Sequence, residues 1–359
     1  MLAAMASLVT MAPSPSGANA STTYVALGDS YASGEGLAPF VASIPSSCDR
    51  SPLSYPYEVA SAIGATTSGT FVDVACAGAR LSDLAGSLDG AAPQRDAVAH
   101  GTDVVTLQSG GNDAFFAELA TSCLKSASTG TSASMGQAGC DYWVNAAERL
   151  LGVTKGSRAI LAATLHAPFR SVLESRLLTV IAALRARQGT RDPLANNRTL
   201  MAVVDYPLIL PPLGAASPSC VVGPGFSYSA QDARTLRAIN VLVDQETQRA
   251  SALYASRHHD AGVFAVDVSG SLSPLSCRID PGSSDVRAID LSHPGYSLHP
   301  LASGQAKIAL AVTVALAARG VVTTASTTST TSTTGTSLAP GVASAVSPSR
   351  AAHRVQPVP

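Results

Sequence analysis

The stretch Tyr24-Val25-Ala26-Leu27-Gly28-Asp29-Ser30-Tyr31-Ala32-Ser33-Gly34-Glu35-Gly36 joins a short apolar run to a turn bounded by glycines. An apolar run of this length followed by breakers is typical of a buried strand, here Tyr24–Leu27. A serine on the strand-to-helix turn places its hydroxyl at the edge of the sheet, with its backbone N–H pointing outward. Gly-Asp-Ser also occurs in plain turns, so the meaning of Ser30 depends on the rest of the chain.

The same kind of apolar run recurs along the chain, and the runs alternate with segments of helical length and spacing. The predicted strands are Phe71–Ala75, Asp103–Gln108, Leu200–Asp205 and Val263–Val268, and the predicted helices are Ser171–Arg187, Gln231–Arg257 and Gln305–Ala318. This alternation predicts an α/β fold, a three-layer α/β/α sandwich whose central, mainly parallel sheet has five strands. Functional sites of such sheets lie at the carboxyl ends of the strands.

Composition limits the classes of partner. The chain has 359 residues, of which 46% are hydrophobic and 13% charged, and its formal net charge is −1. This balance provides no basic patch for a nucleic acid or for an anionic membrane surface. The length suits one large domain, which we place at residues 21–320 and expect to be a monomer.

Both ends of the chain differ in composition from the domain. An apolar run from Met1 to Met11, followed by Ala18-Asn19-Ala20, predicts a signal peptide over residues 1–20 and a secreted protein. A disordered apolar N-terminus is the alternative. The apolar run is too short to span a bilayer. Residues 321–359 are rich in Ser and Thr, which predicts a disordered tail with no membrane anchor of its own.

The chain contains six cysteines, Cys48, Cys76, Cys123, Cys140, Cys220 and Cys277. An even number behind an export signal favours disulfides, although six cysteines allow 15 connectivities. Pairing of nearest neighbours gives Cys48–Cys76, Cys123–Cys140 and Cys220–Cys277. No C-x-x-C pair occurs, which disfavours structural zinc, and we expect no cofactor.

Three further motifs follow predicted strands or precede the last helix. Gly78, in Ala75-Cys76-Ala77-Gly78-Ala79, lets a backbone N–H approach a ligand without an intervening side chain. Asn112, in Ser109-Gly110-Gly111-Asn112-Asp113, offers a neutral amide donor for an oxyanion. His299, in Ser297-Leu298-His299-Pro300, is able to take a proton from a serine and return it to a leaving group. Each motif taken singly also fits an ordinary loop.

In this order, the four motifs resemble those of the SGNH/GDSL hydrolases over the whole span from Ser21 to about Gly320. The resemblance is closest to secreted actinobacterial lipases and esterases, which carry three sequential disulfides. It implies a flavodoxin-like fold and a serine esterase acting on a small-molecule or lipid ester. It also implies that Ser30 is the nucleophile and His299 the base, and that the N–H groups of Ser30 and Gly78 form an oxyanion hole with the Asn112 amide.

A second histidine competes for the role of base. Many members of this family have an Asp three residues before the catalytic His, and that spacing occurs in Asp290-Leu291-Ser292-His293. The residue three before His299 is Tyr296. We favour His299 because small residues and a predicted helix follow it, and because an orienting acceptor need not be a carboxylate. Some relatives use a main-chain carbonyl, which here is expected to be that of Tyr296.

Other functions remain open at this stage. An α/β-hydrolase needs a G-x-S-x-G elbow, which the sequence around Ser30 does not have. A cell-surface adhesion or glycan-binding module has no need for a nucleophile together with a base. Within the family, a polysaccharide deacetylase and a phospholipase A are alternatives, because the substrate pockets lie in variable loops.

Overall fold

The computed structural model describes residues 22–42, 45–126, 166–189, 199–214, 217, 219–277, 284–321 and 323. The predicted signal peptide, residues 1–20, and the part of the predicted tail beyond residue 323 lie outside these ranges. None of the helices within them is long and apolar enough to cross a membrane.

A sheet of five parallel strands lies at the centre of the fold. The strands are β1 (Tyr24–Gly28), β2 (Phe71–Asp73), β3 (Val104–Gln108), β5 (Leu200–Val204) and β8 (Val263–Val266), in the spatial order β2-β1-β3-β5-β8. Every residue of β1, β3 and β5 is buried, which requires cover on both faces of the sheet. The five predicted strands are confirmed, although β2 and β8 each end two residues earlier than expected.

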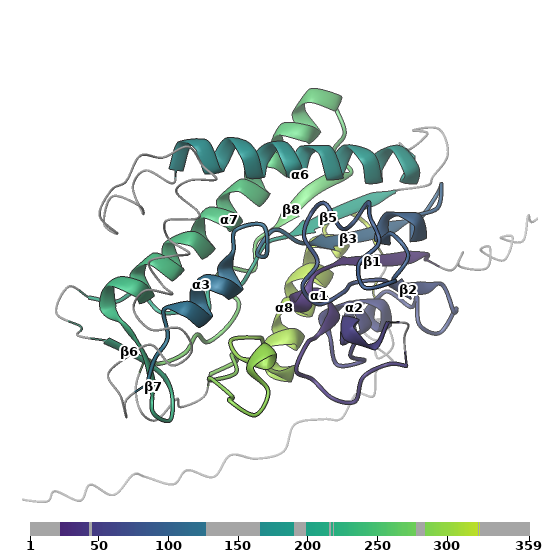
Figure 1. The fold of residues 1–359 in the computed structure, drawn as a ribbon. Helices are drawn as coiled ribbons and strands as arrows, with labels where there is room; N and C mark the ends of the chain where they lie inside the picture. Colours follow the sequence, from purple (N-terminus) through teal and green to yellow (C-terminus); the bar gives the residue numbers. More distant parts are fainter. Residues whose placement is uncertain are drawn as a thin grey trace, which may run out of the picture.

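Helices cover both faces of this sheet, as the sequence predicted (Figure 1). On one face α6 (His166–Gln188) packs against α7 (Ala230–His258), which also contacts β8. On the other face α2 (Tyr55–Ala62) packs against α8 (Ala302–Ala317). The last helix, α8, begins three residues before its predicted start at Gln305.

A second, smaller sheet was not foreseen. It is antiparallel and contains β4 (Lys125–Ser126), β6 (Ser219–Gly223) and β7 (Phe226–Ser229) in the order β4-β7-β6. These strands have two to five residues and mix polar with apolar side chains, so the sequence lacks the long apolar run that marks a buried strand. The sheet lies beside α3 (Phe116–Ser122), to which the Tyr228 hydroxyl is bonded through the carbonyl of Ala120, 2.8 Å away.

Two of the three predicted disulfides are present in the described residues. Cys48 is bonded to Cys76, and Cys220 is bonded to Cys277. Cys123 is also disulfide-bonded. Cys140 lies outside the described residues.

Candidate active site

Ser30 is the first residue of the short helix α1 (Ser30–Ser33), which begins directly beyond the carboxyl end of β1. Asp29 caps this helix, and its carboxylate accepts a hydrogen bond from the backbone N–H of Tyr31 at 3.1 Å. The cap fixes the turn that presents Ser30, whose side chain faces a cavity. The chain reverses the order of its strands between β1 and β3, the position where α/β sheets open a crevice for ligands.

His299 is in contact with Ser30. Its Nε2 lies 2.8 Å from the Ser30 Oγ, and its Nδ1 lies 3.1 Å from the carbonyl oxygen of Ser297. With Nδ1 donating to that carbonyl, Nε2 is left as the acceptor for the serine proton. The hydrogen-bonded acceptor is thus one residue beyond the expected Tyr296, although the carbonyls of Tyr296 and Gly295 also face the ring.

Burial lowers the pKa of His299 to about 4. The backbone carbonyls of Ser297, Tyr296 and Gly295 act in the opposite direction, that of Ser297 most strongly. The nearby positive charge of Arg287 lowers the pKa further. The imidazole is consequently neutral near pH 7 and able to accept a proton.

The loop that carries His299 is tied to the nucleophile's helix by two contacts. The Tyr31 hydroxyl donates to the carbonyl of Leu298 at 2.9 Å. The buried Gln305 amide of α8 donates to the carbonyl of Tyr31 at 3.0 Å and accepts from the N–H of Tyr55 at 2.9 Å. These contacts fix the position of His299 relative to Ser30, although the two residues lie far apart in the sequence.

In the rival pair, His293 is exposed, and Asp290 is partly buried at the edge of the cavity. The His293 Nδ1 is 3.7 Å from the Asp290 Oδ2, and the histidine side chain is 60% exposed. Its ring stacks on Tyr296 with centroids 5.1 Å apart. This pair has the familiar spacing but no contact with Ser30.

Gly78 and Asn112 line the same cavity as Ser30. Gly78 has a φ of +77°, and a Cβ built there would meet no atom within 4 Å, so the backbone at this position is open on its side-chain side. In the described part of the chain, neither the Ser30 nor the Gly78 N–H has a protein acceptor, whereas those of Ala77 and Ala79 bond to the carbonyls of Cys48 and Cys76. The Asn112 Nδ2 donates to the carbonyl of Ala79 at 3.0 Å, which leaves its second hydrogen for a ligand.

Tyr206, two residues after the end of β5, joins two of the motifs and was not predicted. Its hydroxyl donates to Asp29 and accepts from the N–H of Gly111 at 3.1 Å. Burial is the main reason why the pKa of Asp29 rises to about 7. Tyrosine after a strand is too common for this contact to be recognised in the sequence.

Comparisons with known proteins show the family to which the chain belongs. The model of the GDSL-like Lipase/Acylhydrolase family matches residues 26–307. The chain belongs to this family. Lipase 2 of Streptomyces coelicolor is 30% identical over 298 residues, which cover 82% of this chain and 86% of the relative.

Two solved structures are also similar to this member of the family. The extracellular lipase of Streptomyces rimosus is 26% identical, with a TM-score of 0.54 over 83% of this chain and 100% of that chain. The phospholipase A1 of Streptomyces albidoflavus is 24% identical, with a TM-score of 0.57 over 83% of this chain and 99% of that chain, and shows the same fold. Family membership makes this GDSL hydrolase a carboxylic ester hydrolase.

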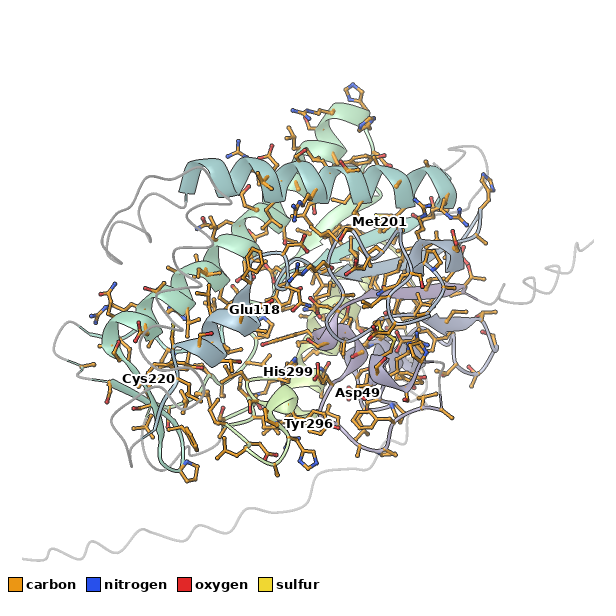
Figure 2. The ribbon with its side chains drawn as sticks, viewed as in Figure 1. Asp49, Glu118, Met201, Cys220, Tyr296 and His299 are labelled. Atoms are coloured by element: carbon orange, nitrogen blue, oxygen red, sulfur yellow. A yellow bond between two sulfur atoms is a disulfide. The ribbon has the colours of Figure 1, made fainter. Side chains whose placement is uncertain are left out.

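The cavity of this hydrolase measures about 610 Å³. Ser30, His299, Gly78 and Asn112 line it, together with apolar side chains of the small sheet and its neighbours, among them Phe116, Leu124, Tyr228 and Ile289. Figure 2 shows His299 and Tyr296 in the same part of the molecule as Asp49, away from Met201 of the central sheet. Within the described residues, no group of three or more His, Cys, Asp or Glu side chains is arranged to hold a metal ion.

One further acidic side chain belongs to the site. Glu35 lines the cavity, and its Oε2 lies 3.6 Å from the His299 Nε2. No feature of the sequence indicated this contact, because a glutamate five residues after the nucleophile has no obvious path to a histidine far along the chain.

Proposed function

We propose that this protein is a secreted lipase or esterase that cleaves carboxylic esters through an acyl-enzyme, with Ser30 as nucleophile and His299 as general base. The proposal rests chiefly on the 2.8 Å contact between the Ser30 Oγ and the His299 Nε2. Secretion is supported by the apolar N-terminal run ending in Ala18-Asn19-Ala20.

In the acylation step, the Ser30 Oγ attacks the ester carbonyl carbon while its proton passes to the His299 Nε2. The carbonyl oxygen becomes an oxyanion, for which the N–H groups of Ser30 and Gly78 and the free Asn112 amide hydrogen are donors. The bond to the alcohol oxygen then breaks, and that oxygen takes the proton from Nε2. The alcohol leaves, and the acyl group stays on Ser30.

In the deacylation step, water replaces the alcohol. His299 takes a proton from the water as the resulting hydroxide attacks the acyl carbon. Collapse of the second tetrahedral intermediate breaks the bond to the Ser30 Oγ, which regains its proton from Nε2. The carboxylic acid is released and the free enzyme is restored.

The lining of the cavity favours a lipid or other apolar acyl ester as substrate. The side chains beyond the polar end come from Phe116, Ala120, Leu124, Tyr228 and Val243. Burial of an acyl chain there is favourable by about 0.8 kcal/mol per methylene group. Thr121, Asn240 and Ser297 add polar groups to this lining, but most of the wall is apolar, which suits an acyl chain better than the hydroxyls of a polysaccharide.

Replacing Ser30 by Ala should lower kcat about 10⁴-fold or more with little change in folding, because only the oxyanion donors and binding would remain. We would assay protein recovered from the medium of an exporting host, with its N-terminus near Ser21, on esters of increasing acyl length. Ser61→Ala, an exposed serine of α2, is the matched control. A serine-directed fluorophosphonate should label the wild type at Ser30. Activity of Ser30→Ala within tenfold of the wild type would refute the mechanism.

A further inference from the structure

Glu35 places a carboxyl group against the atom of His299 that receives the serine proton. Its Oε2 is 3.6 Å from Nε2, and both side chains are 15% exposed. The absence of a side chain at Gly295 makes room for the carboxyl, because a Cβ there would lie 2.8 Å from the Glu35 Oε1. Glu35 also follows α1 directly, and its backbone N–H is bonded to the Ser30 carbonyl at 3.1 Å. The carboxyl is therefore fixed relative to both the nucleophile and the base.

The other side of the imidazole ring faces neutral groups. Nδ1 contacts the Ser297 carbonyl, and the carbonyls of Tyr296 and Gly295 complete that side. An imidazolium forms whenever the serine proton is on His299, and it is stabilised most by a full negative charge nearby. Among the described residues, Glu35 is the acid that contacts the His299 ring.

We propose that Glu35 is a positioning residue that acts through His299, with its ionised carboxylate stabilising the imidazolium formed during acyl transfer. This inference rests on the proposed function of Ser30 and His299. Glu35 supplies on the Nε2 side the negative charge that the neutral carbonyls on the Nδ1 side lack. The carboxylate repels the lone pair of neutral Nε2 and attracts the protonated imidazolium. It therefore stabilises the transition state more than the ground state.

The surroundings of Glu35 set the pH at which it acts. Burial first, then the negative charges of Asp49 and Asp29, raise its pKa to about 7. The titratable and charged groups around it come from three elements, namely Asp29 and Tyr31 at α1, Asp49 after the 3₁₀ turn Ser46–Cys48, and Arg287, Tyr296 and His299 before α8. Arg287 donates to the Gly36 carbonyl at 2.7 Å and not to the Glu35 carboxyl. The stabilising carboxylate is hence present above about pH 7 and lost below it.

The first test is the dependence of kcat on pH, followed with a pH-stat on a soluble short-chain ester. The wild type should gain activity between pH 6 and pH 8. Glu35→Gln should lose this rise, so that its kcat is about 10- to 100-fold below wild type at pH 8 and within about threefold at pH 5.5, with an unchanged KM. Glu35→Asp should recover part of the rise, and Glu58→Gln, an exposed carboxyl on α2, should match the wild type.

Two outcomes would overturn the inference. In the first, the rise of kcat with pH persists in Glu35→Gln. In the second, Glu35→Gln loses activity equally at every pH and has a higher KM, as expected of a structural or binding residue.

A second readout is independent of turnover. The NMR signal of the His299 ring, assigned with His299→Gln, should shift with a midpoint near pH 7 in the wild type and not in Glu35→Gln. An identical titration in both proteins would remove Glu35 from the site. A wild type that lacks ester hydrolysis would instead refute the proposed function, and the NMR titration would still report whether Glu35 acts on His299.

Discussion

Ser30 and His299 are 269 positions apart in the sequence, yet their side chains are hydrogen-bonded. Their relative placement depends on a few single contacts, the Tyr31 hydroxyl to Leu298 and the Gln305 amide to Tyr31. A displacement of a base by about 1 Å is enough to lower a rate roughly 10²-fold. Residues that touch no substrate therefore matter for this site.

The choice between the two histidines is a prediction at this scale. His299→Ala should lower kcat about 10³-fold or more, because Ser30 would lose its proton acceptor. His293→Ala and Asp290→Asn should keep at least about a tenth of wild-type activity, since neither side chain is hydrogen-bonded to Ser30 or His299 and His293 is exposed. Steady-state assays of the three variants, with circular dichroism to check folding, provide the measurement. The opposite order of activities would move the base to His293.

Among the elements, the loop after β2 is the one that carries Gly78, and a disulfide holds it. The buried Cys48–Cys76 bond joins this loop to the 3₁₀ turn Ser46–Cys48, and the N–H of Ala77 bonds to the Cys48 carbonyl at 3.2 Å. The Cys220–Cys277 bond instead holds the small sheet. The two bonds allow a matched comparison of stability with catalysis.

Replacing Cys48 and Cys76 together by Ser should lower the free energy of unfolding by about 2–4 kcal/mol, because the unfolded chain regains a closed loop's entropy. It should also lower kcat about tenfold or more by loosening Gly78. The Cys220/Cys277 double variant should lose a similar amount of stability with a smaller effect on kcat. Urea unfolding and ester assays test both. Equal losses of kcat in the two variants would mean that the first disulfide does not position Gly78.

Across the whole molecule, several carboxyl groups are buried near the ends of the strands. Burial is the largest cause that raises the pKa of Asp29, Asp73 and Asp205 to about 7, and it raises that of Asp244 well above its usual value. In the unfolded chain these groups titrate near pH 4. The folded protein therefore binds more protons than the unfolded chain between about pH 4 and pH 7.

This difference fixes the sign of the dependence of stability on pH. A carboxyl whose pKa is raised by folding stabilises the fold at low pH, and this contribution is lost as the pH rises through the folded pKa. The free energy of unfolding should fall by at least about 1 kcal/mol between pH 5 and pH 8. Urea unfolding at both values measures it, and Asp205→Asn should reduce the difference while lowering stability overall. A protein more stable at pH 8 than at pH 5 would contradict this account.

The sequence by itself determined the architecture and most of the candidate site. The buried strands β1, β3 and β5 are largely apolar runs, because a strand buried on both faces has no polar side, and such a run is visible locally. The order of strands and helices then fixes which loops meet at the carboxyl edge. Ser30, Gly78 and Asn112 each follow a strand, so their proximity was predictable without coordinates.

The tertiary structure decided what depends on the packing of loops. It placed the carbonyl of Ser297, and not chiefly that of Tyr296, on the Nδ1 of His299, a choice made by the local backbone conformation of the loop. It brought Glu35 to Nε2 and Tyr206 to Asp29, and it formed the small sheet from strands too short to recognise. The Glu35 and Tyr206 contacts join residues about 180 to 260 positions apart at distances below 4 Å, and such distances are set by side-chain packing and burial rather than by any local periodicity.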